Sequence, residues 1–300
     1  MKLYKITINP TSAFATTLRG DTLFGQMCWA IFYRFGKERL STLLDDYREE
    51  KKPFLVVSDA FPKGYLPKPK MPSRYLKEKS EDKKLNRKKI WLRLDELSKG
   101  DYSKAKQDKE VGEDKKDITI HNALNYKTFH TGDGFDPHGL EILSLSSKDI
   151  YFLLDEKQLS FQEFKEAFKL ISQMGYGKKT TIGKGRFEYD EEEIEMIEID
   201  NNSKTFMTLS AFSPKALACK DIYYEPFTRF GKFGASRAYK NAFKKPILLA
   251  DVASVVLFDS SCEHQYLGKA ISALSDIPEY KDTVHQGYSI VLPLKEPNYD

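Results

Sequence analysis

The sequence is poor in the residues from which disulfide frameworks, metal sites and membrane spans are built. It has three cysteines in 300 residues, all isolated and without a C-x-x-C pair, so we expect reduced, structural thiols and no zinc site. No apolar run approaches the roughly 20 residues that a transmembrane helix needs. The first eight residues alternate polar and apolar side chains, which predicts a strand and not a signal peptide. We therefore expect a cytoplasmic protein with no membrane partner, no metal and no other cofactor.

The common nucleotide-binding fingerprints are also missing. The most glycine-rich stretch, Gly175–Phe187, has four glycines and four basic residues in thirteen positions. A Walker A loop would need glycine in place of Lys178 and serine or threonine in place of Gly185. A dinucleotide fingerprint would need a third glycine in place of Thr180, and both motifs run from strand to helix, whereas this stretch connects a predicted helix to a predicted strand. An enzyme acting on a phosphate-bearing small molecule is therefore disfavoured.

The composition of this stretch instead predicts a contact with a nucleic-acid backbone. Glycine admits positive φ and the close approach of another backbone, so such a loop can wrap a phosphate chain with its N–H groups while lysine and arginine supply the counter-charge. A helix cap followed by a turn with solvated lysines would explain one glycine and one or two lysines, but not four glycines and four basic residues. The candidate contacts are Gly177, Lys178, Lys179, Gly183, Lys184, Gly185 and Arg186.

Charge is segregated along the chain, although the net charge is only +4. Lys63–Arg93 carries twelve basic and three acidic residues, and Arg229–Lys245 carries six basic residues and no acidic one. Glu188–Asp200 carries eight acidic residues and no basic one. A single charge run is usually a solvated surface, but three basic patches, one of them rich in glycine, predict a face that binds a polyanion. The acidic stretch could instead face a protein partner.

The order of the predicted elements favours an α+β fold with two ferredoxin-like (RRM-like) domains. Asp21 is expected to cap the first helix and Gly36 to end it. Once a long basic insertion at about 60–147 is removed, the first domain (1–200) has the order β-α-β-β-α-β. Its strands are expected at 2–9, 54–58, 150–154 and 186–199, and its helices at 21–35, 39–49 and 160–175.

The second domain (201–300) is expected to be a degenerate copy of the same plan, with strands at 205–212, 252–258 and 287–292 and a helix near 267–275. Within the insertion, residues 118–129 and 140–146 are predicted to be the two arms of a hairpin, and Thr131–Gly134 supplies the turn.

Three further stretches, together with the glycine-rich one, resemble a known family. They are Gly20–Gly25 at the start of the first helix, Tyr65–Lys70 at the start of the insertion, and Arg229–Gly234 in the second domain. A glycine loop that leads from helix to strand and closes a ferredoxin-like domain resembles the RAMP superfamily of CRISPR proteins. In combination, and over nearly the whole length, these stretches are similar to the fourth subunit of the Csm effector complex, the type III-A CRISPR machinery.

This resemblance implies a non-catalytic RNA-binding subunit of antiviral defence. Such a subunit holds the repeat-derived 5′ tag of the guide RNA (the crRNA), between the large polymerase-like subunit and the first backbone RAMP subunit. It also implies that the insertion acts as a thumb that wedges between bases of the guide–target RNA duplex. The predicted hairpin occupies that place, and its side chains suited to stacking and phosphate contact are Tyr126, Lys127, Phe129 and His130.

Other basic residues are candidates for RNA contact with less specific support. Arg19 and Lys68 flank the first helix and the extended start of the insertion, and Arg19 either pairs with a tag phosphate or decorates the surface. Arg229 and Arg237 are possible base or phosphate contacts.

Two rival functions stay open. A guide-processing endoribonuclease of the same superfamily would need an acid–base pair. The resemblance suggests an early histidine for that role, and the first histidine here is His121. For His121, His130 and His138, RNA contact or simple exposure is favoured over catalysis, and for Asp21 the helix cap is favoured over a catalytic role. A free-standing RRM-type binder would need a signature that Lys184–Tyr189 matches only in part.

Overall fold

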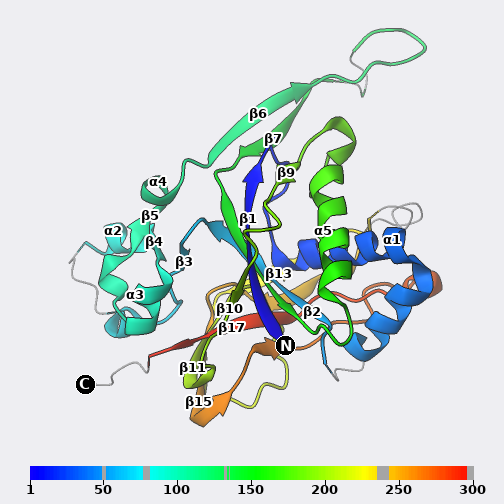
Figure 1. The fold of residues 1–300 in the computed structure, drawn as a ribbon. Coiled ribbons are helices and arrows are strands. Elements are labelled where there is room, and N and C mark those ends of the chain that lie inside the picture. Colours follow the sequence, from blue (N-terminus) through cyan, green and yellow to red (C-terminus); the bar gives the residue numbers. More distant parts are fainter. Residues whose placement is uncertain (49–51, 77–81, 132–133, 135, 235–242, 296–300) are drawn as a thin grey trace.

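The computed structural model describes residues 1–48, 52–76, 82–131, 134, 136–234 and 243–295. Two antiparallel sheets make up its centre, and the predicted insertion extends outward as a small lobe and a long hairpin (Figure 1). The α+β class predicted from the sequence is confirmed.

The first sheet and its helices come from the first 200 residues. They are β1 (Lys2–Pro10), α1 (Gly20–Arg48), β2 (Leu55–Pro62), β8 (Lys148–Leu154), α5 (Phe161–Met174), β9 (Phe187–Glu188) and β10 (Glu195–Ile197). The strand order is β10-β1-β8-β2, with β9 also paired to β1. Along the chain these elements follow the predicted order β-α-β-β-α-β, with β9 and β10 together in the last position.

Local sequence signals account for both long helices. The Ser160 hydroxyl accepts from the Glu163 N–H, and the Glu163 carboxylate accepts from the Ser160 N–H, which closes a capping box at the start of α5. Phe164 and Phe168 recur at helical spacing and are fully buried. In α1, Gly36 has non-helical torsions (φ 89°, ψ 173°) and separates two helical segments, as its predicted role as a stop requires.

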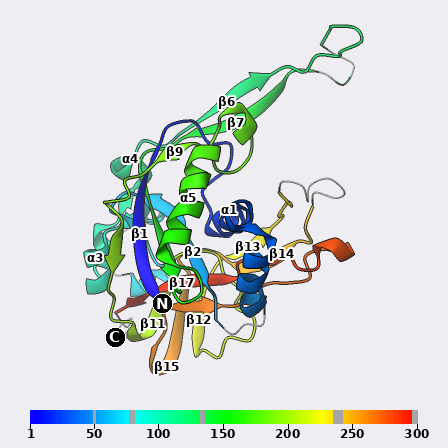
Figure 2. The same cartoon turned by 45° about the vertical axis from the view of Figure 1, so that its right-hand side comes forward.

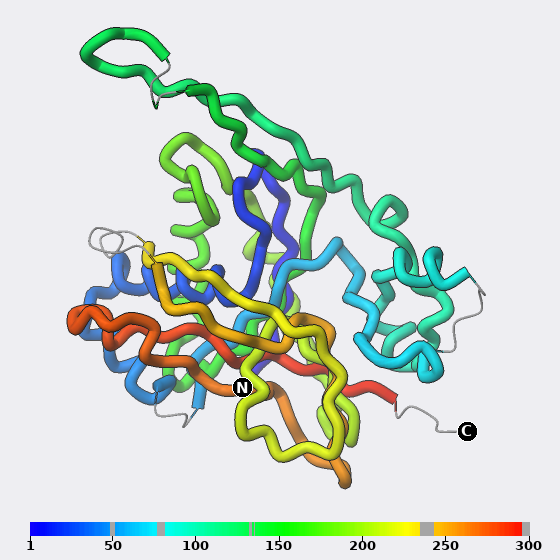
Figure 3. Tube along the Cα trace, turned by 180° about the vertical axis from the view of Figure 1, so that it is seen from behind, coloured from blue at the N-terminus to red at the C-terminus, as the bar shows by residue number. Residues whose placement is uncertain are grey.

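The second sheet has the order β12-β15-β11-β17-β16 and lies next to the first along β2 and β17 (Figure 3). Its strands are β11 (Asn202–Thr208), β12 (Asp221–Tyr223), β15 (Val255–Glu263), β16 (Tyr266–Gly268) and β17 (Tyr288–Leu294). A separate two-stranded ribbon is formed by β13 (Pro226–Arg229) and β14 (Ile247–Ala250). The side chain of Gln286 joins the two halves by bonding both the N–H and the carbonyl of Val57.

The helix predicted near 267–275 is wrong. The chain there is extended: Tyr266–Gly268 pairs with β17, and Ile271 forms a β-bridge with His285. Gly268 and Ala273 have φ of 91° and 58°, which a right-handed helix does not allow. In the described part of the chain after residue 200, no α-helix is present.

The insertion folds into two parts. The lobe contains β3 (Leu66–Pro67), α2 (Lys83–Lys88), β4 (Lys89–Leu92), α3 (Leu94–Lys99), β5 (Lys106–Gln107) and α4 (Asp108–Val111) around a three-stranded sheet. The hairpin pairs β6 (Lys115–His121) with β7 (His138–Ser144), from Lys115 opposite Ser144 to His121 opposite His138. The predicted hairpin is therefore confirmed, but its first arm begins at Lys115 and ends at His121 instead of running over 118–129.

The stretch from Gly175 to Phe187, called the glycine loop below, folds back on itself. The Tyr176 N–H donates to the Gly185 carbonyl at 2.8 Å, and a short 3-10 turn, Thr180–Ile182, forms the outer end. Gly185 has φ of 78°, and a Cβ atom there would lie 2.1 Å from the Tyr176 carbonyl oxygen. This position therefore requires glycine twice over, for its torsion and for its space.

We predict that Gly185→Ala destabilises the protein far more than Gly183→Ala. Gly183 has nearly the same φ, 79°, but a Cβ there meets nothing within 4 Å. Gly183→Ala, the control, should lower the free energy of unfolding by about 1–2 kcal/mol through the torsion alone. Gly185→Ala should lower it by roughly 3 kcal/mol or more, because its Cβ also meets the Tyr176 backbone. Urea unfolding of both variants measures the difference, and equal losses would show that the close approach contributes nothing.

Candidate nucleic-acid interface

The glycine loop rests on the segment that follows β1. The Gly185 N–H donates to the Ala13 carbonyl, the Lys178 N–H to the Thr16 hydroxyl, and the Arg186 N–H to the Ser12 hydroxyl, all at 2.8–3.0 Å. Both limbs of the loop are thus held by residues 12–16.

Tyr176 fixes the loop from inside. Its ring is fully buried, and its hydroxyl donates to the Thr17 carbonyl and accepts from the Arg19 N–H, each at 2.9 Å. Burial raises the pKa of this phenol well above its usual value, so it stays protonated and can donate. The loop is therefore attached to the chain just before α1.

The outward side of the loop is rich in unused donors. Lys178, Lys179 and Arg186 are exposed and Lys184 is half-buried, and none of the four pairs with a carboxylate of the described residues. Within the same described chain, the N–H groups of Gly177, Lys179, Thr180 and Thr181 have no acceptor. Successive free amides beside several cations make an anion-binding surface.

The hairpin adjoins this surface. The N–H and carbonyl of Phe14 bond the carbonyl and N–H of Leu143 at 2.8 and 2.7 Å, so the segment after β1 lies between the glycine loop and the base of β7. Figure 2 shows the hairpin extending from the same end of the molecule as the C-terminal end of α5, where the glycine loop begins.

The hairpin carries exposed aromatic rings beyond its paired strands. Tyr126 is 89% exposed and Phe129 is 77% exposed. The turn that holds them is closed by bonds between Asn125 and the main chain of Lys127, Phe129 and His130. Lys127 and His130 are exposed, whereas the rings of the cross-strand pair His121 and His138 stack at 6.0 Å. The structure therefore groups the candidate thumb residues at one tip.

Arg19 has internal partners. Its guanidinium bonds Asp59 at 2.9 Å and Asp251 at 2.8 Å and lies 4.9 Å from the centre of the Phe227 ring. Contact with a phosphate would have to compete with these two ion pairs.

Lys68 and Arg229 also have partners away from the glycine loop. Lys68 donates to the Asn86 carbonyl in the insertion's lobe. Arg229 pairs with Asp21 at 2.7 Å and with the Thr22 hydroxyl. Arg237 lies outside the described residues.

The two carboxylates that hold Arg19 differ in acidity. Burial raises the pKa of Asp59 to about 6, and the opposing effect of Arg19 does not offset it. Burial also acts on Asp251, but Lys70 at 2.9 Å and Arg19 outweigh it and hold the pKa of Asp251 below its usual value. Asp251, beside the second sheet, therefore keeps its negative charge to lower pH than Asp59 does.

The prediction that Asp21 caps α1 is wrong. The Leu23 N–H already bonds the Arg19 carbonyl, so the first helical turn begins before Asp21 and includes it. The Asp21 carboxylate is buried, facing Arg229 and lying 3.4 Å from His285. Burial lowers the pKa of His285 to about 4, so this histidine is neutral at pH 7.

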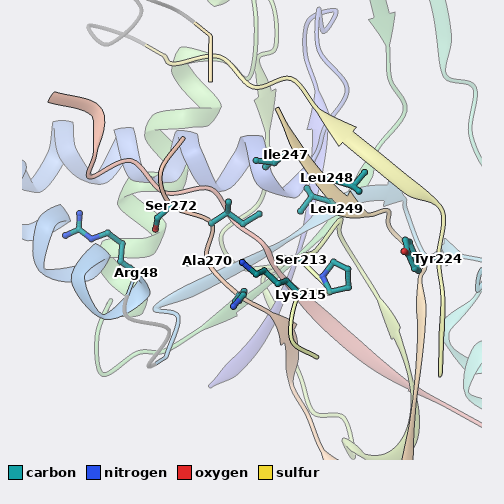
Figure 4. Close-up of a pocket in the computed structure, with 12 residues that line it drawn as sticks. Arg48, Ser213, Lys215, Tyr224, Ile247, Leu248, Leu249, Ala270 and Ser272 are labelled. Atoms are coloured by element: carbon teal, nitrogen blue, oxygen red, sulfur yellow. The ribbon is translucent and has the colours of Figure 1, made fainter. Parts of the chain in front are cut away.

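A shallow pocket of about 520 Å³ lies on the second half, away from these residues (Figure 4). Arg48, Lys215 and Lys269 are its cations, and Arg48 is tied to Asp282 at 3.2 Å. None of the residues that we predicted as RNA contacts lines it.

The described residues contain no group of three or more His, Cys, Asp or Glu side chains that could hold a metal ion. Their helices include none with the length and apolar character of a membrane span.

Sequence reasoning missed the residues that support the interface from beneath. The contacts of Tyr176, Asp59 and Asp251 with Arg19 join residues that lie far apart in sequence, so periodicity and motifs do not reveal their roles. The position of Tyr176 between two glycines, Gly175 and Gly177, was the one available signal, because a large aromatic residue inside a flexible loop has to be anchored somewhere.

No model of a known protein family matches this chain, and no curated protein matches it. Solved structures do. A chain from the crystal structure of the Csm1–Csm4 cassette in complex with cA4 is 16% identical, with a TM-score of 0.63 over 99% of this chain and 100% of that chain. A chain from the Csm3–Csm4 subcomplex in the type III-A CRISPR-Cas interference complex is 18% identical, with a TM-score of 0.58 and the same coverage. The likeness is one of fold, and it agrees with the predicted resemblance: over its whole length, this chain has the fold of a chain found in these Csm4-containing structures.

Proposed function

We propose that this chain is a non-catalytic RNA-binding subunit of a type III-A CRISPR effector complex and that its glycine loop holds the 5′ tag of the guide RNA. The observation that carries the proposal is the outward side of that loop, where four basic side chains without carboxylate partners stand beside four free amides of the described chain. Phosphate oxygens accept from both kinds of donor.

The hydrogen bonds that hold the loop to residues 12–16 support this function. Ser12, Ala13 and Thr16 accept from the inward N–H groups of Arg186, Gly185 and Lys178, and the described loop residues whose N–H groups have no acceptor are Gly177 and, toward the outer end, Lys179, Thr180 and Thr181. A binding surface made of a braced backbone loses little conformational entropy when RNA arrives.

The fold supports a position between protein neighbours. The solved chains that share it come from structures of Csm4 with Csm1 and of Csm4 with Csm3. We propose corresponding partners here, a large polymerase-like subunit and a backbone RAMP subunit. In the same arrangement, the hairpin tip with Tyr126 and Phe129 acts as the thumb that inserts between bases of the guide–target duplex.

We propose no chemistry for this chain. A processing ribonuclease needs an acid–base pair that reaches the substrate, and the Asp21–His285 pair is buried on both sides. We retain the degenerate ferredoxin-like plan as a proposal for residues 201–300, supported by β11, β15 and β17 at the predicted strand positions.

Replacing Lys178, Lys179 and Lys184 together by alanine should weaken RNA binding for every sequence and flatten its salt dependence. Each phosphate contact that is lost lowers the slope of log K against log salt by about 0.7 for a single strand, so the slope should fall by roughly 2. Titrations of the full chain with labelled single-stranded RNA at several salt concentrations measure this.

The matched control removes the same charge elsewhere, from the exposed residues Lys157, Lys215 and Lys281. It should lower affinity only slightly and leave the slope nearly unchanged. A loop variant with the slope of the wild type would exclude the glycine loop as the phosphate contact.

Replacing Tyr126 and Phe129 by alanine should weaken binding of the assembled complex to target RNA without affecting folding, because both rings are exposed. Each stacked base that is lost should cost about 1–3 kcal/mol. Ile118→Ala with Ile120→Ala is the control, since it removes exposed apolar side chains from the same hairpin but no ring. Equal effects of the two pairs would argue for a protein contact and against stacking.

A further inference from the structure

The ribbon formed by β13 and β14 continues beyond its named strands. Lys232 and Phe243 form a further β-bridge, and the Lys244 N–H donates to the Gly231 carbonyl at 2.9 Å. We call residues 226–234 and 243–250 the aromatic ribbon. Near its outer end two large rings face solvent: Phe230 is 71% exposed and Phe243 is 61% exposed.

The charged side chains of the ribbon itself are all basic, and two of them have carboxylate partners elsewhere, Arg229 with Asp21 and Lys245 with Asp276. The aromatic ribbon contains Arg229, Lys232, Lys244 and Lys245 and no acidic residue. The Lys232 ammonium lies 4.6 Å from the centre of the Phe243 ring, and the Lys244 ammonium lies 5.5 Å from that of the buried Phe233 ring. Exposed rings next to ammonium groups offer a stacking surface and a phosphate contact side by side.

Several contacts hold the aromatic ribbon against the start of α1. Arg229 pairs with Asp21, and the Phe227 ring lies under the Arg19 guanidinium. The main-chain N–H of Arg19 donates to the Tyr176 hydroxyl of the glycine loop. Gly234 packs so closely that a Cβ atom there would lie 3.3 Å from the Trp29 indole nitrogen. The ribbon and the glycine loop are therefore both held to the start of α1, through Arg19.

The aromatic ribbon and the hairpin flank the same region. In Figures 1 and 2 their outer ends lie on the same side of the molecule, with the C-terminal end of α5, where the glycine loop begins, between them in height. Each carries two exposed aromatic rings, those of Tyr126 and Phe129 on the hairpin and those of Phe230 and Phe243 on the ribbon. A strand of RNA that crosses the glycine loop would meet one pair on either side.

We infer that Phe230 and Phe243 form a second stacking platform, which binds unpaired bases of single-stranded RNA where the strand leaves the glycine loop. The inference rests on the proposed function. Every base has a π-face, so the platform tolerates any sequence, and Lys232 and Lys244 are placed to neutralise neighbouring phosphates. The absence of any carboxylate on the aromatic ribbon favours this polyanion over a protein partner.

The test is an anisotropy titration of the full chain with two labelled RNAs, single-stranded oligouridine and the same strand with abasic spacers in place of the bases. Phe230→Leu with Phe243→Leu keeps the apolar volume but removes the rings. This variant should bind oligouridine at least about fivefold more weakly than the wild type for each base that loses its stack. It should bind the abasic strand as the wild type does, because no base is there to stack.

Two controls separate stacking from other causes. Phe230→Tyr with Phe243→Tyr keeps both rings and should retain the affinity of the wild type. Leu248→Ala removes an exposed aliphatic side chain from the same ribbon, where Leu248 is 66% exposed, and should leave binding unchanged. Thermal melting of each variant verifies that the fold is intact.

The outcomes distinguish this inference from the proposed function. If the wild type binds oligouridine and the double leucine variant binds it equally well, the platform is excluded while the glycine loop keeps its role. The platform is also excluded if the leucine variant loses equal affinity for both RNAs. If the wild type binds neither RNA, the proposed function itself fails.

Discussion

The arrangement around the glycine loop depends on Arg19. Its main chain bonds the buried Tyr176 hydroxyl of the loop, and its guanidinium joins Asp59 of the first sheet to Asp251 beside the second. One residue therefore links the loop, the start of α1 and both halves of the chain. Buried carboxylates paired with arginine are costly to separate, because breaking such a pair leaves an unpaired charge in a poorly solvated site. These contacts hold the loop in place without help from a ligand.

Folding and binding use different groups of the glycine loop. Its inward amides, Tyr176 and the close approach at Gly185 are used up in holding the loop to residues 12–19. Its outward amides and cations contribute nothing to that attachment and are left for a ligand. The same separation applies to the hairpin and to the aromatic ribbon. In each, the paired strands stabilise the fold, and two aromatic rings are exposed to solvent. Such a molecule presents donors and rings on a rigid support.

Several residues had roles that a linear pattern could not distinguish. Asp21 has the local sequence of a helix cap, but α1 already begins at Gly20. The Asp21 carboxylate faces Arg229 and His285, which are more than two hundred residues away along the chain. Arg19 has the appearance of a free cation for the same reason, since Asp59 and Asp251 lie far along the chain. The extended chain after Gly268 resembles a helix in composition, yet pairing with β17 decides its conformation. In each case a long-range partner overrode a local preference.

Local physics alone determined the two long helices and strands β1, β2 and β8 of the first sheet, the stop at Gly36, the hairpin of the insertion and the position of the glycine loop, because hydrophobic period, capping residues and glycine act over a few residues. The single strand expected at 186–199 is instead two short strands, β9 and β10. Local physics also determined the chemical character of the loop and of the hairpin tip, which depends on side-chain type. Which cations face outward was decided only by the tertiary structure. Burial and ion pairing depend on where distant segments meet, and so Lys178 and Lys179 stay available to a ligand while Arg19 and Arg229 are bound within the protein.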